Sequence, residues 1–320
     1  MTQAATRIER VHVHEDALDA GRARLRLGSL LERAELRPPG LPPAAVLCVR
    51  HVRDPLPGAL RLETADARPP PDWARAFVES LERKLRSAAR PAHEAVPAAA
   101  EAVLFADRAE LLACLARDAR DGTAWLHWWW RDMHGSLAGD SDPVVAAWLE
   151  TPEHVPAALQ LLAAQRQAVA FVAALPARAA TALTLRVAAA HGLAELRHAA
   201  VAPTPTAPTD RPSPVDGRAP PPEPPWRKVV PESAERPLAP SVELLLGMAL
   251  VLRREPQLAR TSSFATATRA WLAAAPALAR AGPPLVAAAA PELRGAATPV
   301  AESTPAPEPA PDRRHAVRDR

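Results

Sequence analysis

The first third of the chain alternates between short apolar runs and segments with a helical hydrophobic period. The run over residues 44–52 is rich in valine and bounded by prolines, which predicts a strand, and residues 103–105 predict a second strand. Between them, large apolar residues at every fourth position predict a helix from Asp72, as its N-cap, to about Ala89. These apolar residues are Trp73, Phe77, Leu81 and Leu85.

Other elements of this region follow from caps and turns. Leucines over residues 16–36 indicate a helix that ends before Pro38-Pro39-Gly40, and Ile8 to Val13 approximates a strand. Asp107 is placed to cap a helix that ends at Asp121-Gly122, and the segment from Leu60 to Leu62 is a candidate hairpin partner of the first strand. The inner face of the Asp107-capped helix carries Leu111, Leu112, Cys114 and Leu115. Residues 1–135 are therefore expected to form a small α+β domain.

From Asp142 onwards the pattern is entirely helical, so the fold class predicted for the chain is α+β and predominantly helical. Helices are predicted over residues 144–150, 152–175 and 177–196, with single prolines suited to first helical positions. We expect residues 142–198 to pack on the N-terminal domain. The remainder divides into a proline-rich disordered linker over 199–240, a short helical segment over 241–295 that Ser241 caps, and a disordered tail over 296–320.

Half of the eight tryptophans lie within six residues, at positions 125, 128, 129 and 130, in a chain without tyrosine. A helix from Thr123 to His134 would place Trp125, Trp128 and Trp129 on one face, widened by Leu126 and Trp130. Such a cluster indicates a core or an interface. Core packing is the main interpretation. The alternative is a protein interface that includes Trp128, Trp130 and Arg131, with Trp226 as a second anchor within the linker.

Charge and composition narrow the function. The 39 basic and 36 acidic residues are interspersed, and only Lys84 and Lys228 are lysine, so no basic patch favours nucleic-acid binding. Cys48 and Cys114 lie in apolar runs and suggest buried thiols in a reducing compartment. The N-terminal segment has no apolar signal-peptide region, and polar residues interrupt the weakly polar run over 157–175, so a cytoplasmic protein without membrane insertion is expected.

Motifs of several enzyme classes are absent from the sequence. These are Gly-x-x-x-x-Gly-Lys-Ser/Thr, Gly-x-Gly-x-x-Gly, Gly-x-Ser-x-Gly, His-Glu-x-x-His and Cys-x-x-Cys. We therefore predict no catalytic residues, no cofactor and no metal. A metal site formed by His12 and His14, with His51 as a third ligand, is one interpretation, but exposed strand-edge histidines are the preferred one. The alternative enzyme site lies around Arg50, His51, Arg53 and Asp54, which flank the first strand and its turn.

Three strings carry a resemblance to a known group of proteins. They are Leu41-Pro-Pro-Ala-Ala-Val-Leu-Cys-Val-Arg50, Arg53-Asp-Pro-Leu-Pro-Gly58, and Phe105-Ala-Asp-Arg-Ala-Glu-Leu-Leu112 followed by Trp128-Trp-Trp-Arg131. Over residues 7–135 the chain resembles uncharacterised bacterial proteins encoded beside phage-tail-like extracellular contractile injection systems. The resemblance implies an assembly or accessory role beside the particle, through contacts with its proteins. A general adaptor or scaffold is the alternative non-enzymatic hypothesis.

Overall fold

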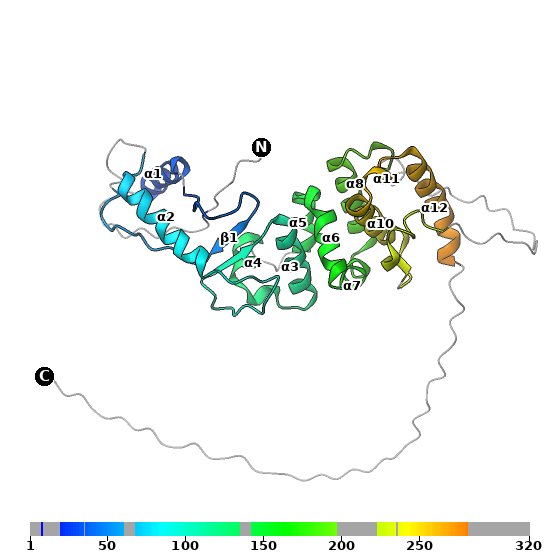
Figure 1. The fold of residues 1–320 in the computed structure, drawn as a ribbon, viewed down its shortest axis with the longest axis horizontal. Helices are drawn as coiled ribbons and strands as arrows, with labels where there is room; N and C mark the ends of the chain where they lie inside the picture. Colours follow the sequence, from blue (N-terminus) through cyan, green and yellow to red (C-terminus); the bar gives the residue numbers. More distant parts are fainter. Residues whose placement is uncertain are drawn as a thin grey trace, which may run out of the picture. The chain divides into compact units, whose positions relative to one another are not determined.

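The computed structural model is predominantly helical, at about 61% helix, with one two-stranded antiparallel sheet in the part of the chain that it describes (Figure 1). The predicted class, α+β and predominantly helical, is confirmed. The residues described are 8, 20–34, 36–60, 68–134, 142–196, 223–234 and 236–280.

The N-terminal elements surround the small sheet. β1 (Val46–Val49) and β2 (Ala102–Phe105) are antiparallel, with Val46 opposite Phe105. Both strands were predicted, and they pair with each other. Of the predicted hairpin partner, Leu60 packs beside Leu27 and Leu30, while residues 61–62 lie outside the described part of the chain. The helices of this part are α1 (Ala20–Arg33), α2 (Pro71–Arg86) and α3 (Arg108–Arg120). Of the strand predicted from Ile8 to Val13, only Ile8 lies within the described residues.

Two predicted helix starts have different outcomes. Asp107 caps α3 as predicted, since its Oδ1 accepts a hydrogen bond from the Glu110 backbone N–H at 2.8 Å. Asp72 does not cap α2, which begins one residue earlier, at Pro71, with Pro70 as its N-cap. Proline at the first helical position has its φ already set and needs no partner for a missing N–H. The run of prolines before Asp72 therefore determines where α2 begins.

The predicted helix from Thr123 to His134 is wrong. A short 3₁₀ helix, η1 (Ala124–Leu126), is followed by α4 (Trp128–His134), and extended backbone at His127, with ψ 123°, separates them. The break turns Trp125 out of the core to 61% exposure, while the three tryptophans of α4 are at most 5% exposed. Trp128 and Trp130 are therefore core residues and not the interface proposed from the sequence.

The central helices pack directly on α3. They are α5 (Pro143–Glu150), α6 (Val155–Ala164), α7 (Ala168–Ala173) and α8 (Ala177–Ala190), with a 3₁₀ turn, η2 (Pro152–His154), before α6. The helix predicted over 152–175 is divided, because Arg166 adopts a left-handed conformation with φ 57° between α6 and α7. α3 contacts α5, α6 and α7.

The C-terminal helices extend the same core. They comprise η3 (Pro231–Ala234), α10 (Pro240–Arg254), α11 (Pro256–Ala259) and α12 (Ser262–Arg280). α10 begins at Pro240 after the N-cap Ala239, so the predicted Ser241 cap is wrong. This helix contacts α6, α7 and α8, and one cluster of buried side chains runs from β2 to α12. Residues 281–295 of the predicted helical segment and the predicted tail over 296–320 lie outside the described residues.

The predicted linker is wrong from residue 223 onwards, while its residues 199–222 lie outside the described part. Trp226 is fully buried against Gly247 of α10, with the ring of Trp271 at 4.9 Å. Arg254 holds the same segment, because its guanidinium donates to the Glu232 carboxylate and the Val229 carbonyl. Trp226 therefore anchors its own chain, and the predicted partner contact at this residue is wrong.

We expect Gly247→Ala to destabilise the protein by about 1–3 kcal/mol through overpacking. A Cβ atom at this position would lie 2.3 Å from the Trp226 indole, so the favourable Gly-to-Ala change in a helix is outweighed. Urea unfolding measures the effect. The control is Gly28→Ala in α1, where a Cβ meets nothing within 4 Å and no loss is expected. If Gly247→Ala lowers the free energy of unfolding by the same amount in the Trp226→Leu variant as in the wild type, then the contact with the indole is not the cause of the loss.

Candidate functional site

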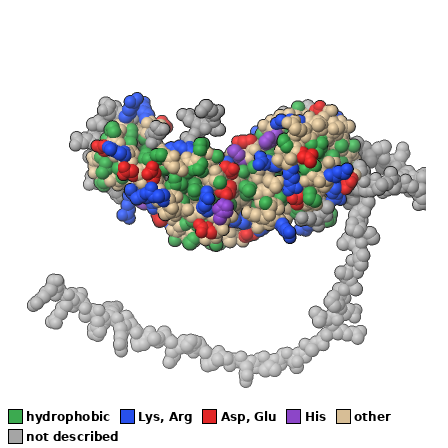
Figure 2. Space-filling view, in the orientation of Figure 1, with side chains coloured by type: hydrophobic (Ala, Val, Ile, Leu, Met, Phe, Trp, Pro, Cys, Tyr) green, Lys and Arg blue, Asp and Glu red, His purple; other side chains and the backbone are tan. Residues whose placement is uncertain are grey.

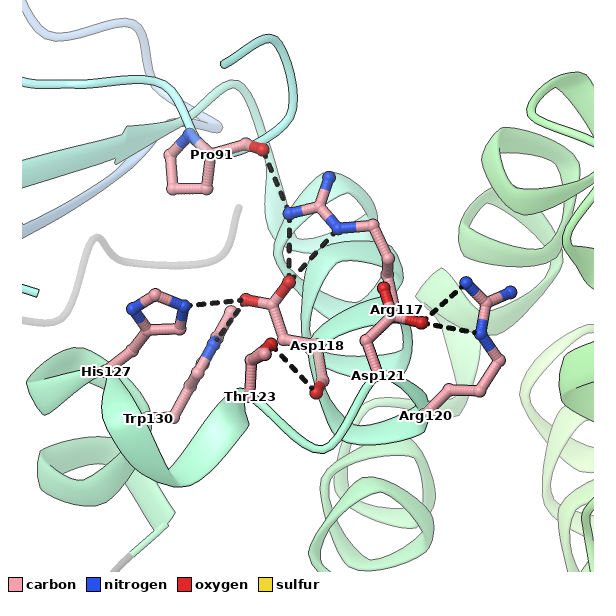
Figure 3. A network of polar contacts seen from close by, with 8 residues as sticks. All are labelled: Pro91, Arg117, Asp118, Arg120, Asp121, Thr123, His127 and Trp130. Carbon is pink, nitrogen blue, oxygen red and sulfur yellow. Dashed lines mark hydrogen bonds and ion pairs between the residues drawn. The ribbon is translucent and has the colours of Figure 1, made fainter. Parts of the chain in front are cut away.

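The segment after α3 is organised by the carboxylate of Asp118, whose side chain is only 8% exposed. Oδ1 accepts hydrogen bonds from Nε and Nη2 of Arg117 at 3.1 and 3.0 Å, and Oδ2 accepts one from the Trp130 indole at 2.9 Å (Figure 3). The Asp118 carbonyl accepts from the backbone and hydroxyl of Thr123. Arg117 also donates to the Pro91 carbonyl. The Asp118 carboxylate thus connects α3 to α4 through Trp130. It also binds Arg117, which connects α3 to the loop that begins at Pro91.

His127 lies beside this carboxylate but does not hydrogen-bond to it. Its Nε2 is 3.9 Å from Asp118 Oδ2, and its ring stacks on Trp129 with centroids 4.3 Å apart. Burial lowers the pKa of His127 below its ordinary value; the Asp118 charge opposes this shift and the Arg117 charge adds to it. The imidazole is therefore neutral at pH 7.

The three tryptophans of α4 differ in their hydrogen bonding. Trp128 donates its indole N–H to the Ala100 carbonyl at 2.7 Å, and Trp130 donates to Asp118. Trp129 is 1% exposed, yet its Nε1 has no hydrogen-bond partner within the described residues. Nδ1 of His127 is also buried, and no described residue hydrogen-bonds to it. Two polar atoms at the centre of this network are therefore unsatisfied, which is uncommon in folded proteins.

Two cavities lie on either side of the η1 turn. The first has a volume of about 480 Å³ and is formed by residues 91–96, the end of α3, and the residues Thr123, Leu126, His127 and Trp129. The second is a groove of about 940 Å³ beside Trp125, and its lining is mostly apolar. Its lining includes the apolar side chains Val144, Phe171 and Leu175 and the arginines Arg120 and Arg131.

One of the predicted interface residues lies at the groove. Arg131 is exposed, lines the groove, and donates to the Trp125 carbonyl at 3.3 Å, which ties α4 to η1. The sequence predicts that Trp125 lies on the apolar face of a helix. In the structure, 61% of its surface is exposed. No local pattern distinguished it from its neighbours, because the break at His127 has no proline or glycine to mark it.

The alternative enzyme site does not form a cluster. Oδ1 of Asp54 accepts from the Trp73 indole at 2.9 Å and from the Leu56 backbone at 3.0 Å, so this carboxylate orders the turn and holds α2. Arg50, His51 and Arg53 are exposed, and none of the four residues lines either cavity.

Burial also affects the two cysteine thiols. It raises the pKa of Cys48 and of Cys114 to about 12, so both thiols stay protonated at neutral pH and neither is a nucleophile. Among the described residues, no group of three potential ligands could hold a metal ion, and His12 and His14 lie outside that part.

Comparisons with known proteins give no relative: no family model, curated protein or solved structure matches the chain. Basic and acidic side chains are interspersed on the face shown in Figure 2, as the sequence predicted. Within the described residues, no helix combines the length and apolar character needed to cross a bilayer. The candidate site is therefore defined by geometry alone: an exposed tryptophan, an apolar groove and a second cavity, all lined by residues of one turn or next to it.

We expect Asp118→Ala to destabilise the protein by about 2–4 kcal/mol, because it leaves the buried Trp130 donor and the Arg117 charge without their acceptor. Asp121→Ala is the matched control. Arg120 and Asp121 are also adjacent and doubly hydrogen-bonded, but the Asp121 side chain is 46% exposed (Figure 3). Removing this exposed pair should cost at most about 1 kcal/mol. Equal losses in urea unfolding would contradict the central role of Asp118.

We expect the free energy of unfolding to fall as the pH decreases from 7.5 to 5.5. The pKa values of His127 and His191 are lowered by burial, so below about pH 6.5 the unfolded chain binds protons that the folded state takes up less readily. His127→Gln should reduce this pH dependence, measured by urea unfolding at both pH values. His154→Gln, at a side chain that is 41% exposed, should leave it unchanged. An identical pH dependence in wild type and His127→Gln would contradict the assignment.

Proposed function

We propose that this protein acts without catalysis, as an accessory or assembly protein of a contractile, phage-tail-like particle, and that it binds a protein of that particle through the groove beside Trp125. The exposure of Trp125 is the observation that carries the proposal. A tryptophan with 61% of its surface in water forgoes most of the stabilisation that its burial would give. Exposed tryptophans beside apolar grooves are typical of the residues that dominate binding energy in interfaces.

The groove has the character of a protein-binding surface. Its volume of about 940 Å³ accommodates large side chains, and the apolar walls formed by Val144, Phe171 and Leu175 would bury them. Arg131 lies at this surface and has no ion pair with any described residue, whereas Arg120 is already paired with Asp121. We therefore infer that the partner offers an apolar side chain with a carboxylate next to it.

The connection with an injection particle rests on the resemblance of three strings in the N-terminal part. The first and third strings are in contact, because Val46 pairs with Phe105 across the sheet and the Phe105 ring lies 5.5 Å from Trp130. Together they contain the sheet, the start of α3 and the buried tryptophans of α4.

Two alternative hypotheses assign other functions to this protein. A general adaptor unrelated to such particles would use the same groove, and only the identity of its partner separates the two hypotheses. An enzyme around Arg50, His51, Arg53 and Asp54 has less support, because Asp54 holds Trp73 and the other three side chains do not face a described cavity.

We expect the full chain, tagged and produced in a cell that makes a contractile particle, to co-sediment with the purified particle. Trp125→Ser should reduce the bound fraction at least about tenfold, as loss of a central interface residue does. Its free energy of unfolding should change by less than about 0.5 kcal/mol, since the side chain is exposed.

Leu25→Ser is the matched control, because Leu25 is 75% exposed on α1 and lines neither cavity. It should co-sediment as the wild type does. Absence of the wild-type protein from the particle would refute the particle role. Equal binding of wild type and Trp125→Ser would refute the groove as the contact.

A further inference from the structure

One edge of β1 pairs with β2, and the backbone groups on its other edge point away from the sheet. The Arg50 N–H donates to the Glu101 carbonyl at 2.9 Å, and the strand keeps this register throughout. In an antiparallel ladder, the N–H and C=O groups of alternate residues point to the same edge. Those of Cys48 therefore point to β2, as those of Arg50 do. The N–H and C=O groups of Leu47 and Val49 point outward.

The hydrogen bonds of β2 agree with this alternation. The Ala102 carbonyl and the Leu104 N–H are both bonded to Ala89, on the side of β2 that faces away from β1. β2 thus has partners on both edges. The outward backbone groups of Leu47 and Val49, in contrast, have no hydrogen-bond partner in the part of the chain that the structure describes. Two N–H and two C=O groups in this arrangement match the backbone of one further strand.

The sequence of β1 does not protect its outer edge. Edge strands of soluble proteins commonly carry charged residues, prolines or bulges, which prevent pairing with other chains. β1 reads Val46-Leu-Cys-Val49, without a charge or a proline, and it pairs with β2 without a bulge. All four side chains are half-buried, so an added strand would also cover apolar surface. No residue of β1 lines either cavity, so this edge is separate from the groove beside Trp125.

The charges at the end of β1 indicate what kind of strand fits this edge. Arg50 and Arg53 are exposed, and neither forms an ion pair with a described residue. The acids next to them have other partners. Glu101, opposite Arg50, is bonded to Lys84 at 3.0 Å, and Asp54 accepts the bonds that order the turn. The end of β1 therefore has excess positive charge, which complements a carboxylate from another chain.

We propose that the outer edge of β1 binds an extended acidic segment of a partner protein as an added antiparallel strand. The antiparallel sense is that of the existing pair and is the more stable one per residue. It places the N-terminal end of the added segment, with its carboxylates, beside Arg50 and Arg53. A second copy of this chain fits less well. Pairing of two β1 strands through Leu47 and Val49 would place residues 43–46, which contain no acid, opposite these arginines. The proposal does not depend on the particle role.

The test uses the full chain labelled with ¹⁵N and the peptide acetyl-Asp-Glu-Val-Thr-Val-Thr-amide. Bound peptide should slow the hydrogen exchange of the Leu47 and Val49 amides, whereas that of Cys48, already bonded to β2, should change little. The same peptide is also made with N-methyl groups on both valines or on both threonines, which removes the donors from one edge of the added strand. One methylated peptide should bind at least about tenfold more weakly than the parent, and the other should bind nearly as well.

Charge reversal tests the role of the arginines. The double variant Arg50→Glu and Arg53→Glu should bind the acidic peptide at least about tenfold more weakly, and should bind acetyl-Lys-Lys-Val-Thr-Val-Thr-amide better than the wild type does. The matched control is Arg178→Glu with Arg186→Glu, two exposed arginines of α8, which should bind both peptides as the wild type does. Both double variants should unfold in urea as the wild type does, because all four side chains are exposed.

Four outcomes would overturn the proposal. They are no saturable binding of the acidic peptide, no slowing of exchange at Leu47 and Val49, equal losses with the two methylated peptides, and equal losses in the two double variants. Sedimentation equilibrium of the free chain tests the remaining occupant. A dimer that the acidic peptide dissociates would assign the edge to a second copy of the chain and would also overturn the proposal.

Discussion

The buried carboxylate of Asp118 is the constraint on which the functional half of the N-terminal region depends. A carboxylate that is 8% exposed needs several donors, and it obtains them from Arg117, on its own helix, and Trp130, twelve residues further along the chain. To reach Oδ2, the Trp130 indole must enter the core, which requires the chain to turn sharply between α3 and α4. The extended backbone at His127 provides that turn, and it rotates Trp125 outward. The exposed tryptophan and the buried ones are thus two results of one hydrogen-bonded network.

Local signals in the sequence account for the elements but not for this turn. Asp107, the two valine-containing strands and the inner face of α3 were predicted correctly because each depends on residues within a few positions. The tryptophan segment was predicted as one helix because its apolar spacing fits a helical period. Its true conformation depends on bonds to Asp118 and to Ala100, which lies 28 residues before Trp128. Neither bond leaves a pattern in the sequence near Trp125.

The segment predicted as a linker also owes its conformation to a contact between residues that are distant in the sequence. The prolines on both sides of Trp226 are typical of a segment that has no core of its own. What places Trp226 inside the molecule is the absence of a side chain at Gly247, where the indole lies against the backbone of α10. A glycine within an apolar helix normally weakens it. The sequence alone marked Trp226 as a candidate anchor for a partner and did not indicate that the indole packs on Gly247. Only their contact explains both residues.

The segment around η1 retains groups that folding alone would bury or pair. Trp125 remains in water beside an apolar groove, and Trp129 and His127 remain without hydrogen-bond partners beside a cavity. Trp125 lies in η1, and this turn is held by Thr123 and Arg131. A turn fixed at both ends keeps Trp125 and the groove in place before any partner arrives, which reduces the ordering cost of binding there.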